Sequence, residues 1–579
     1  MKKITISKAA LAAVTALLIP CSVGFARTLP GGFIDAGQLL SELEPERHVL
    51  PNPQIPDVTL DLAKPPHNIE TEKIYVKKAN LNWKEGVKLV ETKDTDHHAY
   101  YANEQEHLSK KVHAAIDGLY GKEMTFSELV EAAEIASNTL RNLGYPTALV
   151  YMPRQNMQNG ELTLNVMLGT IGDVQIINNS KLTDKRNAGF LAALKKGDLI
   201  YNSKINRRLL IMNELAGVKT TASLAPGSKP GTANLIVKSD CLEKSGGALY
   251  VDNWGSRNTG RYRYGISYHY NNLNHTGDQL QANYLISNKK DSKNYSFQYE
   301  TPIDREGTKA HLLYSESTYD VMGKNGQYTG GARTWEFGIT QPMERDLTRS
   351  NFMEYAYRHR DINDTMDFSG RRFRADKYSD SFEVEVKGYT RRLKDMFSYN
   401  LSSGIGHLGV TKDDASINQT ADKWFQKSNA NFYYVHNFSN VTSMHVSGSA
   451  QWSWSNNLDS SEDFYIGGPT AVRAFASGEA NGDCGALGTV EFRYRTDVKG
   501  LTLTAFYDVG YVRYNRHKLD GWDGSNSRTL AGAGIGLIYQ ASRDWYAKLD
   551  WAKPLSNSYS ESYGRANHNM LWFRLVKQI

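Results

Sequence analysis

Hydrophobic and polar positions alternate from Gly246 to the C-terminus, in segments of about ten residues separated by Gly, Asn, Asp and Ser. In 262–270 every even position is apolar or aromatic, and in 501–511 every odd position is. The same alternation recurs in 280–286, 488–495 and 545–551. Successive side chains of a β-strand point to opposite faces, so this period predicts strands with one apolar and one polar face. The C-terminal part of the chain is therefore predicted to be an antiparallel β structure.

Upstream of this region the pattern changes to a helical period. Thr125-x-x-Glu128 is a capping box, in which two side chains satisfy free N–H groups at a helix start. Apolar residues follow at helical spacing, and Gly144 can end the helix in a left-handed conformation. The pattern predicts a helix over 125–143. Further helices are predicted over 186–195 and 203–215.

Short strand candidates lie around these helices, at 148–151, 162–166, 174–177 and 235–237. Helices and strands thus mix from residue 73 to residue 240. This length of about 168 residues has room for two small α+β modules. We place them at 73–169 and 170–240.

The N-terminus has the pattern of a secretory signal peptide. Lys2, Lys3 and Lys8 precede an apolar stretch over 9–20, and small residues close it at Gly24 and Ala26. This order predicts a signal peptide over 1–26, cleaved after Ala26. A membrane anchor is the alternative, but about 12 apolar residues are too few for roughly 30 Å of hydrocarbon.

A short amphipathic segment follows the signal peptide. Asp35 can cap a helix over 34–44, whose apolar residues form one face, and Pro45 ends it. The region 27–46 is therefore predicted to carry one isolated helix. A proline-rich stretch over 47–72 is predicted to be an extended linker. The alternative is a disordered leader that is helical only by chance.

Composition removes several classes of protein. The 579 residues contain no apolar run of 18, so no spanning helix is expected, and 11% aromatic residues argue against disorder. The net charge of +6 is spread along the chain, so no nucleic-acid partner is expected. Export would leave Cys241 and Cys484, which can pair but do not make a disulfide scaffold. No zinc spacing, P-loop or Ser/His/Asp arrangement is visible, so no metal, cofactor or catalytic residue is predicted.

The alternating region admits two interpretations, a soluble sheet or a membrane β-barrel. A soluble sheet needs a cover on its apolar face, but no helix follows within 242–579. Many strands also end in Tyr or Trp, as the aromatic girdles of a barrel require. Sixteen strands would give about 21 residues for each strand and its connection, whereas eight would give about 42. The pattern favours a membrane barrel of about 16 strands.

Several motifs, in their order and spacing, resemble one family. Gly144-Tyr-Pro-Thr-Ala148 and Asn213-Glu-Leu-Ala-Gly-Val218 lie in the α+β region, and Asp252-Asn-Trp-Gly-Ser256 opens the barrel. A loop motif spans Phe464–Phe475, and an Asp-x-Gly strand motif is matched at 508–510. Together they resemble the two-partner secretion transporters, also called haemolysin secretion/activation proteins.

The loop motif supplies the candidate site residues. The family pattern Gly-Gly-x-x-x-Val-Arg-Gly-Phe/Tyr is matched at Gly467, Gly468, Val472, Arg473 and Phe475. Position 474 departs from it, because Ala474 stands where Gly is usual. The resemblance implies that a long loop, about 456–486, folds back into the barrel. It also implies that Asp508 and Gly510 on the barrel wall are the partners of this loop.

The resemblance implies a fold and a function. The fold is two periplasmic POTRA modules, 73–169 and 170–240, and a 16-stranded outer-membrane barrel over 241–579, with the helix of 27–46 as a plug. The function is export of one large unfolded, β-rich exoprotein to the cell surface of a diderm bacterium. Further expected partners are outer-membrane lipid and the barrel assembly machinery that inserts the protein. Edge strands of the POTRA modules can capture an extended chain through backbone hydrogen bonds.

Three other functions compete with export as interpretations of this sequence. A passive porin leaves the α+β region unexplained. A barrel-protein insertase shares the loop motif but generally carries more POTRA modules than this chain has room for. An outer-membrane hydrolase needs a catalytic constellation that the sequence does not show.

The alternation makes one contact predictable. Residues 501, 503, 505, 507 and 509 must face lipid, so Asp508 and Gly510 face the lumen. Arg473 lies in a loop of about 30 residues, long enough to reach back into the pore. We therefore predict a bidentate Arg473–Asp508 pair that holds the loop inward. The alternative is that both charges are separately solvated in a wet lumen.

Overall fold

The structure, a computed structural model, describes residues 58–60, 73–83, 104–157, 159–256, 259–289, 291–323, 326–368, 370–414, 424–518, 524–540, 542, 544–555 and 568–579. The predicted signal peptide, plug helix and most of the predicted linker lie outside these residues. The chain forms two compact units. One contains 54–214 and 218–242, and the other contains 243–579 with 215–217.

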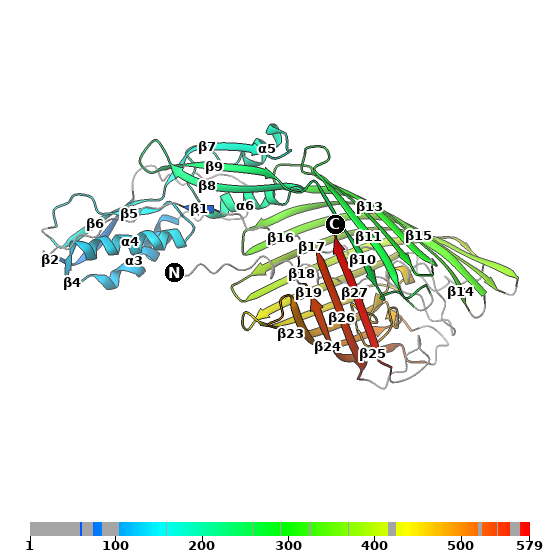
Figure 1. The fold of residues 1–579 in the computed structure, drawn as a ribbon. Helices are drawn as coiled ribbons and strands as arrows, with labels where there is room; N and C mark the ends of the chain where they lie inside the picture. Colours follow the sequence, from blue (N-terminus) through cyan, green and yellow to red (C-terminus); the bar gives the residue numbers. More distant parts are fainter. Residues whose placement is uncertain are drawn as a thin grey trace. The chain divides into compact units, whose positions relative to one another are not determined.

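The first unit begins with two helices and small sheets: β2 (Lys73–Val76), β3 (Lys78–Trp83), α3 (Glu104–Ile116), the 3₁₀ turn η1 (Asp117–Leu119), β4 (Lys122–Thr125), α4 (Phe126–Asn142), β5 (Leu149–Tyr151) and β6 (Glu161–Met167) (Figure 1). The main sheet has the order β3-β6-β5, with β3 parallel and β5 antiparallel to β6. A separate antiparallel ladder joins β2 to β4.

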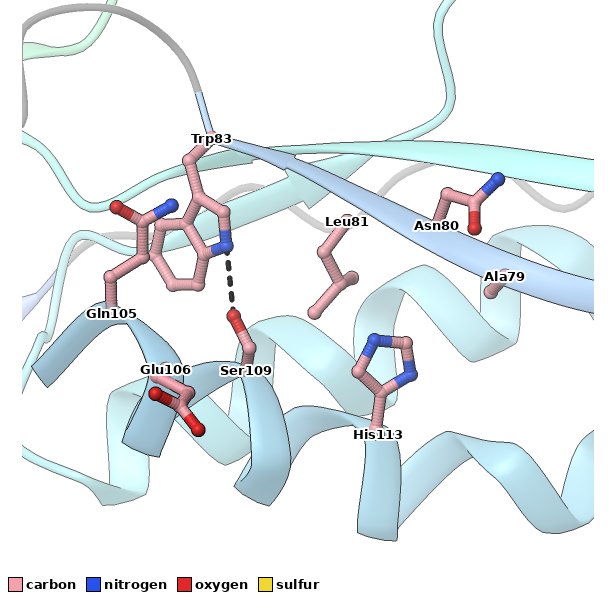
Figure 2. Close-up of a pocket in the computed structure, with 8 residues that line it drawn as sticks. All are labelled: Ala79, Asn80, Leu81, Trp83, Gln105, Glu106, Ser109 and His113. Atoms are coloured by element: carbon pink, nitrogen blue, oxygen red, sulfur yellow. Dashed lines mark hydrogen bonds between the residues drawn. The ribbon is translucent and has the colours of Figure 1, made fainter. Parts of the chain in front are cut away.

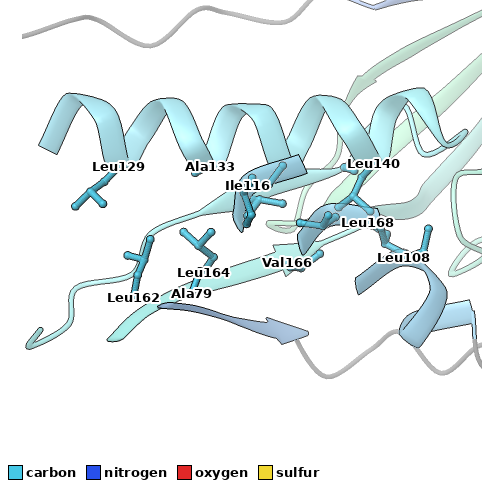
Figure 3. Packing of buried hydrophobic residues seen from close by; sticks show 14 of the residues in the cluster. Ala79, Leu108, Ile116, Leu129, Ala133, Leu140, Leu162, Leu164, Val166 and Leu168 are labelled. Carbon is cyan, nitrogen blue, oxygen red and sulfur yellow. The ribbon is translucent and has the colours of Figure 1, made fainter. Parts of the chain in front are cut away.

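Helix α4 forms where the capping box predicts it. The Thr125 backbone N–H donates to the Glu128 carboxylate at 2.7 Å, and the Glu128 N–H donates to the Thr125 hydroxyl at 3.2 Å. The apolar face of the helix packs on the sheet, where Leu129, Ala133 and Leu140 lie among the side chains of β6 (Figure 3). The core of this part therefore sits between α4, α3 and the sheet.

The sequence prediction missed helix α3. Its buried residues are Leu108, Val112 and Ile116, one in every four positions, among charged and polar neighbours. Such a narrow stripe is a weak signal by itself. The helix is stabilised because its apolar residues pack against the core formed by α4 and β6.

The second part of this unit has a four-stranded sheet of order β1-β8-β9-β7 and two helices. Its elements are β1 (Val58–Leu60), β7 (Thr170–Asn179), α5 (Asp184–Leu191), α6 (Asn202–Asn213), β8 (Val218–Pro226) and β9 (Thr232–Cys241). The prediction of a helix over 186–195 is wrong at its end. After Leu191 the chain tightens into i→i+3 bonds, at 3.3 Å for Ala192 and 2.9 Å for Leu194.

The second unit is a closed antiparallel barrel of sixteen strands in the described residues, which confirms the predicted strand number. Its strands are β10 (Ser245–Asp252), β11 (Arg263–Asn271), β12 (Gln279–Ser287), β13 (Ser292–Pro302), β14 (Lys309–Gly323), β15 (Gly326–Arg345), β16 (Arg349–Phe368), β17 (Arg371–Arg391), β18 (Asp395–Asp413), β19 (Trp424–Asn437), β20 (Thr442–Ser453), β23 (Cys484–Arg495), β24 (Leu501–Arg513), β25 (Ser527–Tyr539), β26 (Trp545–Pro554) and β27 (Met570–Gln578). Strand β10 pairs with β27 and closes the ring.

The predicted facing of the strands is confirmed on β24. Tyr507 and Val509 are 45% and 36% exposed, whereas Asp508 between them is fully buried. Strand length differs from the expectation of about ten residues. Strands β15, β16 and β17 have 20, 20 and 21 residues, twice what a bilayer crossing needs. Segments expected to be loops thus continue the backbone ladder of their neighbours.

No helix among the described residues is long and apolar enough to cross a bilayer. The two cysteines of the described chain are free: Cys241 is exposed and Cys484 is buried.

Candidate functional site

A buried loop, residues 454–483 between β20 and β23, forms the centre of the candidate site. It contains a 3₁₀ turn, η2 (Ser460–Glu462), and a two-stranded ladder of β21 (Phe464–Tyr465) with β22 (Asn481–Gly482). Its apolar side chains pack on inward-facing residues of the barrel wall. The cluster comprises Phe464, Ile466, Val472, Ala474, Phe475 and Ala480 of the loop with Phe506, Val512, Leu530 and Ala552 of the wall. The loop therefore lies inside the lumen.

The two glycines of the motif make a tight turn. Gly468 has φ +121°, in a region that side chains rarely adopt, and a Cβ on Gly467 would lie 2.5 Å from the Ala476 carbonyl oxygen. Backbone bonds close the turn, from Val472 N–H to the Ile466 carbonyl at 3.0 Å and from Phe475 N–H to the Val472 carbonyl at 3.1 Å. This geometry places Arg473 at the surface of the turn that faces β24.

Arg473 and Asp508 form a bidentate ion pair. The Arg473 Nε and Nη2 atoms each donate to one Asp508 carboxylate oxygen at 2.9 Å. The Arg473 backbone N–H adds a third bond at 3.1 Å, and the Thr489 hydroxyl donates to the same carboxylate at 3.0 Å. Both charged groups are buried, so they are not separately solvated.

Arg473 has further partners that the sequence does not predict. Its Nη1 donates to Glu491 on β23 at 2.7 Å and lies 3.5 Å from an Asp550 oxygen on β26. The guanidinium carbon lies 3.2 Å from the centre of the Phe506 ring, and the Arg473 carbonyl accepts from Trp572 Nε1 at 2.7 Å. Four wall strands thus hold one loop residue.

The charges of this cluster balance. Three carboxylates, on Glu491, Asp508 and Asp550, meet Arg473 and two further cations. Arg493 lies 2.8 Å from Glu491, and Lys548 lies 3.1 Å from Asp550. A signal for these residues exists in the sequence, because they stand on the polar faces of the alternating segments 488–495 and 545–551. The alternation does not show which strands are neighbours in the barrel.

Gly510 makes room for the loop itself. A Cβ at this position would lie 2.7 Å from Ile466 Cβ and 3.1 Å from Val472 Cγ2. Apolar loop residues therefore fill the space that Gly510 leaves on the wall. Ala474 replaces the usual glycine without strain: its Cβ lies over Gly532, where another Cβ would come within 2.4 Å.

A groove of about 590 Å³ runs between β3 and α3 in the first unit (Figure 2). Strand β3 is the outermost strand of its sheet in the described part of the chain. One of its backbone edges pairs with β6, and the other pairs with no described strand. Trp83 closes one end of the groove and donates from Nε1 to the Ser109 hydroxyl at 3.0 Å. The groove is lined by Ala79, Asn80, Leu81, Trp83, Gln105, Glu106, Ser109 and His113.

Polar contacts fix the register of β3. Lys78 Nζ lies 3.0 Å from Glu161 on β6, and Asn80 donates to the same carboxylate at 3.1 Å. These bonds lower the pKa of the Glu161 carboxyl below its usual value. On the helical side of this part, burial together with the Asp117 carboxylate raises the pKa of Tyr120 to about 12. Among the described residues, no group of three or more His, Cys, Asp or Glu side chains is arranged to hold a metal ion.

A closed sixteen-stranded barrel with a loop folded into its lumen, preceded by an α+β region, defines an outer-membrane barrel transporter. Residues 231–539 match the family described as haemolysin secretion/activation protein ShlB/FhaC/HecB, and 98–169 match the ShlB-type POTRA domain. The chain belongs to this haemolysin secretion/activation family. It is thus an outer-membrane transporter of two-partner secretion with a POTRA region, and not an enzyme.

Individual relatives agree with this assignment. The heme/hemopexin transporter protein HuxB of Haemophilus influenzae (strain 86-028NP) is 25% identical over 493 residues, 82% of this chain and 85% of HuxB. The outer membrane transporter CdiB of Dickeya dadantii (strain 3937) is 23% identical over 428 residues, 69% and 72% of the two chains. The solved CdiB from Escherichia coli has the same fold, with a TM-score of 0.63 at 17% identity over 90% of this chain and 93% of CdiB. The predicted family, function class and outer-membrane location are confirmed.

Proposed function

We propose that this transporter captures its unfolded exoprotein on the open edge of β3 and passes it through a barrel that the 454–483 loop obstructs. The observation that carries the proposal is the groove beside this edge. An extended chain can add to a free strand edge through backbone bonds, while the groove receives alternate side chains. The six residues of β3 span about 20 Å, enough to pair with a similar length of cargo.

We assign residues 73–169 and 170–240 to two POTRA modules in the periplasm. Each contains a sheet covered by two helices, which supports the division. The region 27–46 is proposed to plug the lumen, supported by its amphipathic sequence. The predicted linker is interrupted by β1, which pairs with β8, so only the residues before β1 tether this region. Lipid contacts the outward face of the barrel, and the barrel assembly machinery inserts it.

Filling the groove tests the capture step. Ser109→Tyr places a ring in the groove, whereas His107→Tyr adds the same ring on an exposed residue of α3 outside the groove. The assay measures binding of the purified full-length transporter to the unfolded N-terminal part of the exoprotein encoded beside it. We expect Ser109→Tyr to weaken binding at least about tenfold, a loss of about 1.4 kcal/mol. Equal binding by both variants would refute capture at this edge.

A further inference from the structure

A second set of buried ion pairs holds the start of the 454–483 loop, on the N-terminal side of Arg473. Here the loop supplies the acids and the wall supplies the bases. Asp459 and Glu462 of the loop meet Lys377 of β17, Arg360 of β16 and Lys427 of β19. At Arg473 the polarity is the reverse, since the loop supplies the base and the wall the acids. The two contact sets use no wall strand in common.

Asp459 joins the wall to the first turn of the loop. Its Oδ2 lies 2.8 Å from Lys377 Nζ. Its Oδ1 accepts from the Ser461 N–H at 3.1 Å and from the Ser461 hydroxyl at 2.7 Å, so the same carboxylate caps η2. Lys377 lies beside a register shift in the β17–β18 ladder. Bulges commonly redirect a side chain, and here Lys377 is buried against the loop.

Glu462 is held on both sides. One oxygen lies 3.2 Å from Arg360 Nη1, and the other lies 2.7 Å from Lys427 Nζ. Its backbone carbonyl accepts from Lys427 at 3.1 Å and from Gln451 of β20 at 2.7 Å. Arg360 also donates to the Ser461 carbonyl at 3.1 Å. These contacts fix both the side chain and the backbone of Glu462. A contact that only neutralised the charge would need the side chain alone.

We propose that Asp459 and Glu462 are positioning residues that anchor the base of the loop independently of Arg473. The inference rests on the proposed role of the loop as an obstruction of the lumen. Because the base anchor shares no residue with the Arg473 cluster, release of Arg473 alone leaves the base of the loop in place. Glu479, which lies 3.0 Å from Arg528 of β25, also holds the end of the loop, so the loop does not leave the lumen as a whole. Removing one partner of a buried pair leaves an uncompensated charge, so loss of the base anchor should destabilise the inward loop strongly.

Charge exchange at Lys377 tests the anchor. Lys377→Glu places two acids together and should shift the loop toward displaced positions by about 100-fold or more, measured as increased open time in single-channel recordings. Asp459→Lys combined with Lys377→Glu restores an opposite-charge pair but not the cap of η2, so it should return conductance part of the way toward the original and further than Asp459→Lys alone. The matched control is Lys387→Glu with Glu354→Lys on the same wall, since Lys387 pairs there only with the wall residues Glu354 and Glu385 in the described chain.

The outcomes separate the anchor from the loop's role in secretion. Failure of the exchanged pair to restore conductance, or equal effects at Lys387, would overturn the anchor. Secretion of the exoprotein is measured in the same strains, with heat-modifiable gel mobility as the check that each barrel is folded. If conductance follows the anchor but secretion is unchanged in every variant, the anchor and the obstruction stand, and the proposal that the exoprotein passes through the lumen that this loop obstructs falls.

Discussion

Truncation of Arg473 is the most informative perturbation of the lumen. The side chain carries two bonds to Asp508, one to Glu491 and a longer ion pair to Asp550. Arg473→Ala would leave three buried carboxylates with only Arg493 and Lys548 as cations. One uncompensated buried charge of this kind costs about 3–5 kcal/mol. This free-energy cost falls on the inward conformation of the loop. The barrel itself is not affected, because Arg473 takes no part in the backbone pairing of its strands.

Asp508→Ala should destabilise the inward conformation of the loop less than Arg473→Ala does. Arg473 then keeps Glu491 and Asp550 as partners, but one cation is left in excess. The double variant restores the balance of two acids and two bases. We therefore expect the double variant to be no worse than Arg473→Ala, because the two residues act as one unit. Arg473→Lys keeps the charge but not the bidentate geometry, so it should fall between Arg473→Ala and the unmodified protein.

The assay measures the exoprotein released into the medium and the single-channel conductance of each purified variant. Heat-modifiable gel mobility shows whether the barrel has folded and inserted. We expect the single variants to lose secretion and gain conductance while the barrel remains folded. Additive losses in the double variant would show that Arg473 and Asp508 act separately. Full secretion by Arg473→Ala would refute a role for the pair in holding the loop.

Three further predictions concern other parts of the chain. Gly510→Ala should overpack the loop, at a cost of about 1–3 kcal/mol, and raise conductance, whereas Gly488→Ala, which has 3.8 Å of clearance, should not. Deletion of 31–46 should raise conductance if the segment plugs the lumen; unchanged conductance would count against a plug. Thr125→Ala should lower the stability of the POTRA region by about 1 kcal/mol in thermal unfolding. The hydrogen bond from the Thr125 backbone N–H, which Thr125→Ala keeps, lowers the pKa of Glu128. The contribution of the Glu128 carboxylate is therefore complete above the unfolded pKa and is lost as the pH falls through the lowered value; a pH-independent difference between Glu128→Ala and the original protein would contradict its part in the cap.

The sequence alone determined the features that depend on near neighbours in the chain. Alternation fixed which face of β24 carries Asp508, because strand geometry sends successive side chains to opposite sides. The capping box fixed the start of α4, because both partners lie within one turn. Signals of this kind need no knowledge of the rest of the fold.

Only the tertiary structure decided contacts between distant segments. Asp459 and Lys377 are 82 positions apart, and Arg473 meets Glu491 and Asp550 only because their strands enclose one lumen. The barrel also decided the length of β15 to β17, since each strand continues while its neighbour offers backbone partners. Helix α3 formed despite its weak pattern because a core was available to cover. Burial and strand pairing between distant segments supply the free energy for these contacts, strand lengths and helix. Neither can be inferred from the spacing of residues within one segment.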